Sequence, residues 1–217
     1  MAVEHRARLV DVVAHAPDTR SLFLEPAERL AFRPGQFVSC LVPAGADTLN
    51  RPYSIASSPD DARWEILLNL VPGGPGSQYL FERGAGDTIR FTGPWGTFVV
   101  DALPDAETVF VAERTGIAPI RAILNDAARR TPRPPLRLLY GTDLPLYRDE
   151  LAALPGVEVE VVPPGDVWDA AVRRWIDGDA DRSRHFYICG VGAPVLALRD
   201  RLRAAGYARR AVQYERW

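Results

Sequence analysis

The chain has 217 residues, an apolar fraction of 47%, a charged fraction of 25% and a formal net charge of −2. Such a composition is typical of a soluble globular protein with one large domain or two small ones, and its near-neutral charge gives no field that would draw the whole molecule to nucleic acid or anionic lipid. All 26 basic residues are arginines, so lysine chemistry is excluded and anion recognition must use arginine forks, helix ends or hydroxyls.

The cysteine content and the lengths of the apolar runs exclude further classes of protein. Cys40 and Cys189 are the two cysteines, too few to ligate an iron–sulfur cluster, and they do not resemble a disulfide scaffold. The N-terminal segment has no long apolar run after a basic stretch, and no segment approaches the roughly 18 apolar residues of a membrane span. We therefore expect a cytoplasmic protein with no membrane span and no metal site.

The first hundred residues are predicted to form short strands separated by turn clusters such as Arg33-Pro34-Gly35 and Gly93-Pro94-Trp95-Gly96. The predicted strands are 8–13, 21–24, 36–41, 53–56, 64–70 and 88–92. One helix is expected over 77–82, with Ser77 as its N-cap and Gly84 as its stop. Six such strands favour a small closed antiparallel barrel. Residues 64–70 alternate only partly, which indicates that both faces of that strand are covered.

After residue 103 the pattern changes to strands that alternate with helices. The predicted strands are 108–112, 136–140, 157–162, 185–189 and 211–214, and the predicted helices are 119–130, 146–153, 167–176 and 194–205. Pro119 is expected at the first helical position, where a missing N–H costs nothing. This order predicts a doubly wound α/β domain with a five-stranded parallel sheet. The expected domains are therefore 1–103 and 104–217.

Two segments of the first domain suit a phosphate-bearing aromatic ligand. In Arg51-Pro52-Tyr53-Ser54, extended backbone places Arg51 and Tyr53 on one face and Ser54 on the other. An arginine fork fits a phosphate, a tyrosine ring can lie on a flat ligand and a serine hydroxyl can donate to a ring nitrogen. The loop 72–77 is rich in glycine and leads into a helix, which is typical of an anion site. Alone, each segment also fits an ordinary strand start or a flexible loop.

Two segments of the second domain lie where parallel sheets bind ligands. The turn Glu113-Arg-Thr-Gly116 follows the first strand, where a dinucleotide fold receives pyrophosphate, although only one glycine is present. Cys189-Gly190 ends the fourth strand and borders the same crevice. Cys189 is either catalytic or simply a small buried residue.

Taken in order, these segments resemble the signature set of the ferredoxin–NADP reductase superfamily, and the resemblance covers essentially the whole chain. The matching segments are Arg51-Pro-Tyr-Ser54, Gly76-Ser77, Gly93-Pro-Trp-Gly-Thr-Phe98, Thr115-Gly-Ile-Ala-Pro119, Cys189-Gly190 and Glu215-Arg-Trp217. The resemblance implies an FAD-binding barrel followed by an NAD(P)-binding domain. FAD, rather than FMN, is implied by family habit alone.

The resemblance also implies residue roles. Arg51, with Pro52 fixing its backbone, would hold the flavin pyrophosphate together with the amides of Gly76 and Ser77. Tyr53 would lie against the isoalloxazine or ribityl chain, and Ser54 would reach flavin N5. In the second domain Thr115, Gly116 and Gly190 would receive the nicotinamide nucleotide, Cys189 and Glu215 would lie near the hydride-transfer point, and Trp217 would cover the flavin ring.

The implied function is electron transfer between NAD(P)H and a separate acceptor through FAD. The acceptor would be a ferredoxin, an oxygenase component or a soluble flavin, and the direction stays open. Glu113 and Arg114 stand where the family usually has two glycines, so the alternative is a non-catalytic or regulatory flavoprotein with weakened nicotinamide binding. Asp143, after the second strand of the domain, favours a ribose hydroxyl and hence NADH, while Arg148 could reverse this preference.

Overall fold

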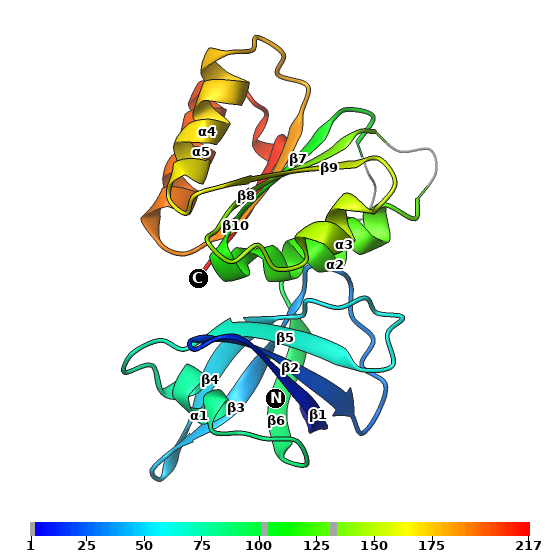
Figure 1. Ribbon diagram of the computed structural model, residues 1–217, viewed down its shortest axis with the longest axis vertical. Coiled ribbons are helices and arrows are strands. Elements are labelled where there is room, and N and C mark those ends of the chain that lie inside the picture. The colour runs from blue at the N-terminus through cyan, green and yellow to red at the C-terminus, as the bar shows by residue number, and fades with distance from the viewer. Residues whose placement is uncertain (1–2, 101–103, 131–133) are drawn as a thin grey trace. The chain divides into compact units, whose positions relative to one another are not determined.

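Six antiparallel strands form in the first half of the chain, where short apolar stretches alternate with turn-forming residues. The computed structural model describes residues 3–100, 104–130 and 134–217. The strands are β1 (Glu4–Ala16), β2 (Thr19–Pro26), β3 (Phe37–Ala44), β4 (Asp47–Ser54), β5 (Trp64–Asn69) and β6 (Thr88–Trp95) (Figure 1). They pair in the order β4-β3-β6-β1-β2-β5, and a bridge between Ile55 and Ile66 joins the ends of this order. The predicted six-stranded antiparallel fold is confirmed.

The interior of this sheet is apolar, and its two-sided burial is most complete at β5. Leu22, Leu24, Trp64 and Ile66 are among the buried core side chains. Residues 64–68 are all buried, as their incomplete alternation predicted. Strand β5, which is buried on both faces, also carries a charged residue: Glu65 is only 2% exposed.

Two polar side chains on the neighbouring strands β2 and β1 form a hydrogen-bonded chain with this buried carboxylate; we call Ser21, His15 and Glu65 the polar row. Ser21 Oγ on β2 donates to Glu65 Oε1 on β5. His15 Nε2 on β1 lies 2.8 Å from the same hydroxyl oxygen. A buried carboxylate without a partner would be costly, so the polar row is a condition for folding this part of the sheet.

Helix α1 (Pro75–Phe81) corrects the predicted start of the first helix. Its N-cap is Gly74, and Pro75 takes the first helical position, where its fixed φ suits the helix. Ser77 therefore lies inside the first turn. Its hydroxyl accepts from the Val71 N–H at 2.9 Å and donates to the Gly74 carbonyl at 3.1 Å, which ties the glycine-rich loop to the helix. The predicted turn at 93–96 is also shifted, because β6 continues to Trp95, which pairs with Phe37.

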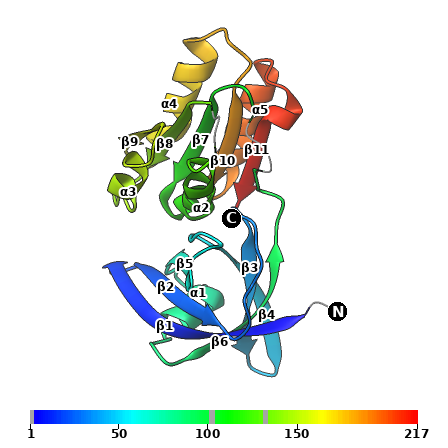
Figure 2. The same ribbon diagram turned by 90° about the vertical axis from the view of Figure 1, so that its right-hand side faces the viewer.

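The second half contains five parallel strands covered on both faces by helices. The strands are β7 (Thr108–Glu113), β8 (Leu136–Gly141), β9 (Val157–Val162), β10 (His185–Gly190) and β11 (Val212–Arg216), side by side in the order β11-β10-β7-β8-β9 (Figure 2). The helices are α2 (Ile117–Ala127), α3 (Arg148–Ala152), α4 (Asp166–Val172) and α5 (Ala193–Ala204). Figure 1 shows α2 and α3 on one face of the sheet and α4 and α5 on the other. The predicted doubly wound domain is confirmed.

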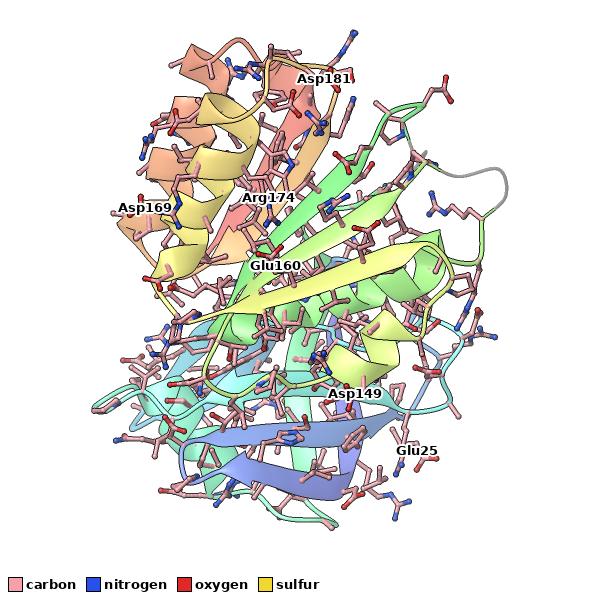
Figure 3. The ribbon with its side chains drawn as sticks, turned by 45° about the horizontal axis from the view of Figure 1, so that its top comes forward. Glu25, Asp149, Glu160, Asp169, Arg174 and Asp181 are labelled. Atoms are coloured by element: carbon pink, nitrogen blue, oxygen red, sulfur yellow. The ribbon has the colours of Figure 1, made fainter. Side chains whose placement is uncertain are left out.

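Helix boundaries in this half differ from the predicted ones for local reasons. A 3-10 turn, Arg114–Gly116, precedes α2, so Pro119 is not the first helical residue. Tyr147 has φ 60°, a left-handed conformation that delays α3 to Arg148. Helix α4 ends at Val172 and continues as a π-helical turn, Arg173–Asp177. There Arg174 forms an ion pair with Glu160 of β9 (Figure 3).

The chain divides into two compact units, Met1–Val99 and Val100–Trp217. The domain boundary expected at 103/104 adjoins residues 101–103, which lie outside the described residues, so its exact position stays a prediction. Within residues 3–100, 104–130 and 134–217, no helix combines the length and the apolar character needed to cross a membrane.

Candidate functional site

Arg51, Tyr53 and Gly76 pack together in the first unit. A Cβ added to Gly76 would lie 2.6 Å from Arg51 Cγ and 2.9 Å from the Tyr53 hydroxyl oxygen, so only glycine lets these side chains close on the start of α1. The Arg51 guanidinium donates to the Asn50 carbonyl at 2.9 Å and is paired with no carboxylate of the described residues. An unneutralised guanidinium beside a glycine-rich helix start fits a phosphate group.

Tyr53 and Ser54 are held in place by strand pairing with β3. Tyr53 pairs with Val38 and Ser54 with Phe37. Burial raises the pKa of the Tyr53 phenol, with the neighbouring Cys40 thiol as a smaller cause, so the ring carries a neutral hydroxyl. Pro52 is exposed on the opposite face of β4, and Ser54 is buried. The first unit therefore brings Arg51 and Tyr53 against Gly76, with Pro52 and Ser54 on the same strand and Ser77 in the same helix.

In the second unit, Gly116 lies directly against the end of β10. A Cβ added to Gly116 would approach the Cys189 carbonyl oxygen to 2.4 Å and the Gly190 nitrogen to 3.0 Å. The turn after β7 and the end of β10 are thus in backbone contact. Thr115 and Gly116 belong to this turn after β7, which is a 3-10 turn. This contact brings together the two segments that the sequence predicted to border a nucleotide crevice.

Glu113 and Arg114, the two departures from the family pattern, have distinct conformations. Arg114 has φ 49°, in the left-handed region that favours glycine, and its side chain is exposed. Glu113 Oε1 accepts from the Gly165 N–H at 3.0 Å and from Trp168 Nε1 at 3.2 Å. The Glu113 carboxylate is therefore fixed toward the start of α4.

The C-terminal residues are tied to the same edge of the sheet. Glu215 pairs with Cys189 in the β10–β11 register, and the Trp217 N–H donates to the Gly190 carbonyl at 3.1 Å. Cys189 is fully buried, and burial, followed by the negative charge of Glu215, raises its thiol pKa well above the ordinary value. The thiol therefore stays protonated and suits hydrogen bonding rather than nucleophilic attack. The Trp217 side chain is 36% exposed.

Asp143 follows Gly141, which pairs with Glu113 at the carboxyl ends of β8 and β7. It is exposed after the end of β8, where its charge contributes to raising the pKa of Tyr140, although burial is the larger cause. Arg148, the residue that could reverse the nucleotide preference, forms an exposed ion pair with Asp149 at 2.8 Å.

Sequence reasoning missed Trp168. A Cβ added to Gly190 would lie 3.0 Å from Trp168 Cη2, so the indole packs directly on the end of β10. The residue lies in α4, which the sequence treated as an ordinary helix. The available signal was a tryptophan in the first turn of a helix that follows the carboxyl end of a parallel strand, where ligand crevices form.

Comparison with known proteins agrees with the two units. Residues 7–100 match the family model described as the oxidoreductase FAD-binding domain. The chain is 33% identical to ferredoxin–NADP reductase B of Sorangium cellulosum over 97% of this chain and 96% of that protein. It is 32% identical to the ferredoxin–NAD(P)+ reductase component of the naphthalene 1,2-dioxygenase/salicylate 5-hydroxylase systems of a Ralstonia species. That match covers 74% of this chain and 52% of the component.

Solved structures show the same architecture. The Amycolatopsis cytochrome P450 reductase GcoB superposes with a TM-score of 0.81 at 29% identity, over 99% of this chain and 69% of that one. A ferredoxin–NADP+ reductase from Neisseria gonorrhoeae, solved with FAD and NADP, has a TM-score of 0.83 at 22% identity over 100% of this chain and 99% of its own, a likeness of fold. With a relative this similar over nearly its full length, the chain belongs to the ferredoxin–NADP reductase family.

Proposed function

We propose that this protein is a flavin-dependent oxidoreductase that passes electrons between NAD(P)H and a separate acceptor through bound FAD. The observation that carries the proposal is the packing of Arg51 and Tyr53 on Gly76 within a segment that matches the FAD-binding domain. FAD, when bound, supplies the exchange between hydride transfer and single-electron transfer. The protein supplies binding, orientation and electrostatics.

In the first unit, Arg51 binds the FAD pyrophosphate and the amides of Gly76 and Ser77 complete that contact. Arg51 is suited to this because no carboxylate within residues 3–100, 104–130 and 134–217 pairs with its guanidinium. Tyr53 orients the isoalloxazine or ribityl portion through its neutral phenol ring. Ser54 would supply a hydrogen bond to flavin N5 when FAD is bound.

In the second unit, the turn that contains Thr115 and Gly116 binds the phosphates of the nicotinamide nucleotide, with Gly190 beside it. Cys189 and Glu215 orient the reacting portion, and the protonated Cys189 thiol is a weak donor there. Trp217 would cover the flavin ring of bound FAD in the absence of the nucleotide. Asp143 favours NADH by repelling a 2′-phosphate.

The acceptor that we propose is a ferredoxin or an oxygenase component. Relatives support this class, since one is named a ferredoxin–NADP reductase and another the electron transfer component of toluate 1,2-dioxygenase of Pseudomonas putida. The chain has two cysteines, fewer than an iron–sulfur cluster requires, so a cluster in the electron path must lie outside these residues. Both cysteines are free, which fits the reducing cytoplasm that we propose as the compartment.

An anaerobic absorbance titration of the purified protein tests the proposal. We expect the protein to purify yellow with FAD and its flavin band to bleach when NADH or NADPH is added. A colourless protein that cannot be reconstituted with FAD or FMN would overturn the flavin assignment.

Removal of Trp217 should change the flavin spectrum and the nucleotide affinity. An unchanged spectrum and unchanged kinetics would contradict its covering role.

Glu113 and Arg114 support a second candidate, a regulatory flavoprotein with weakened nicotinamide binding. The same titration separates the two functions. A protein that holds FAD but is bleached by neither NADH nor NADPH, while dithionite still reduces it, would favour the regulatory function.

A further inference from the structure

Three segments meet at the point where the strand order of the parallel sheet reverses, between β7 and β10. The chain leaves β7 toward β8 and β9 and later returns to place β10 on the other side of β7. Open α/β sheets bind nucleotides outside the carboxyl ends of strands at such a point. Here these ends carry Glu113 on β7 and Gly190 on β10, and Trp168 of α4 packs on Gly190.

Close packing restricts how a ligand can approach this point. Gly116 packs against the Cys189 carbonyl, and this contact between the turn after β7 and the end of β10 leaves no room even for a Cβ. A phosphate must therefore approach the amides of the Arg114–Gly116 turn from outside. That approach lies within reach of the side chain that immediately precedes the turn, which is Glu113.

A freely rotating carboxylate at residue 113 would oppose this binding. It would compete with phosphate for the amides of the turn and repel its charge. In the structure the carboxylate is instead satisfied elsewhere, by the Gly165 N–H at 3.0 Å and the Trp168 indole N–H at 3.2 Å. Gly165 has φ 86°, a conformation that suits glycine and sets the direction of its amide.

We propose that Trp168 is a positioning residue that holds the Glu113 carboxylate away from the phosphate-binding turn. This proposal rests on the proposed function, in which the turn receives the nucleotide phosphates. Trp168 acts through Glu113, because its indole N–H donates to that carboxylate while its ring packs on Gly190. The pair would let a turn without the usual glycines accept a dinucleotide.

The test is a double-mutant cycle on the FAD-loaded full chain. Trp168→Phe keeps an aromatic ring over Gly190 and removes the N–H donor, whereas Glu113→Gln keeps the acceptor oxygen and removes the charge. Dissociation constants for NAD+ and NADP+ would be measured by calorimetry for both variants, the double variant and the wild type, at low and high salt. Trp95→Phe is the matched control, because it removes an indole donor to Thr92 in the other unit.

We expect Trp168→Phe to weaken binding about fivefold at low salt, which corresponds to about 1 kcal/mol of charge repulsion. The effect should shrink at high salt because the repulsion is screened. The double variant should bind as Glu113→Gln does, since no charge then remains to be restrained. Glu113→Asp, which keeps the charge but is too short to reach both donors, should weaken binding as well and serves if Trp168→Phe does not fold.

Three results would overturn the inference: unchanged binding by Trp168→Phe, a loss independent of salt, or a double variant as weak as Trp168→Phe alone. The last two would assign Trp168 a packing role. If the wild type itself binds neither NAD+ nor NADP+, the nucleotide part of the proposed function fails and the inference fails with it. If the wild type binds and Trp168→Phe matches it, only the inference fails.

Discussion

The two units contain the same kind of feature, a glycine that allows a close approach beside a proposed phosphate site, in two different settings. Gly76 in the first unit meets the side chains of Arg51 and Tyr53, whereas Gly116 in the second unit meets the backbone of Cys189. Side chains can move aside, but strand backbone cannot. The first glycine therefore mainly leaves room for ligand-binding side chains, whereas the second is also required for the packing of the fold.

Replacement of these glycines gives the largest expected effects. Gly116→Ala would force its Cβ into the Cys189 carbonyl at 2.4 Å, and we expect the second unit to lose about 3 kcal/mol of stability, the upper range for overpacking. Gly76→Ala should cost less stability but displace Arg51 and reduce flavin content. Urea unfolding and flavin quantification measure both quantities. Equal stability losses in the two variants would contradict the distinction.

Arg51→Ala tests the proposed flavin contact of the first unit. Loss of one charge-assisted bidentate contact should weaken FAD binding by roughly 1.5–3 kcal/mol. Arg90→Ala is the matched control, since Arg90 lies on β6 of the same unit and forms an exposed ion pair with Glu4 at 2.7 Å. Fluorescence titration of the apoprotein with FAD gives both affinities. Equal losses in the two variants would mean that the overall charge of the unit, rather than Arg51, attracts the flavin.

Arg114→Gly tests the backbone conformation of the turn in the second unit. Arg114 has φ 49°, a conformation that costs a side-chain-bearing residue about 1 kcal/mol relative to glycine. We therefore expect Arg114→Gly to stabilise the second unit by about that amount in urea unfolding. Arg114→Ala removes the same charge but keeps the Cβ, so it should leave stability nearly unchanged. A similar gain in both variants would assign the effect to charge.

The smallest predicted effect is a dependence of stability on pH that involves one histidine in each unit. Burial lowers the pKa of His15 and of His185 from the ordinary value of 6.5, with Glu65 partly opposing the shift at His15 and the charge of Arg210 adding to the shift at His185. The unfolded chain therefore takes up protons more readily than the folded one. The resulting stability is present above pH 6.5 and is lost as the pH falls below it.

His15→Gln tests the contribution of the polar row. It should reduce the loss of stability between pH 7.5 and pH 5.5 without abolishing it, because His185 still titrates. Denaturant unfolding at the two pH values measures this. A larger loss in His15→Gln than in the wild type would reverse the assigned direction of the His15 shift.

The sequence predicted the architecture and most strands, because apolar runs and turn residues are local signals. Strand β9 was placed with its observed ends, Val157–Val162. The errors at Ser77 and Pro119 arose where a neighbouring proline or a 3-10 turn set the helix start, which residue preferences alone do not resolve. The bond between Glu113 and Trp168 joins residues far apart in sequence. No local pattern predicts this hydrogen bond, although a glutamate at 113, where the family usually has glycine, indicated that the position is unusual.

Each unit encloses one of the two cysteines, and this distribution has an experimental consequence. Cys40 and Cys189 are both fully buried, and burial raises the pKa of Cys40 to about 12 and that of Cys189 well above its ordinary value. A thiol-specific reagent should therefore react with either one only when its own unit opens. Pulse alkylation followed by peptide mass spectrometry would then read the opening of the two units separately in one sample of the unmodified protein.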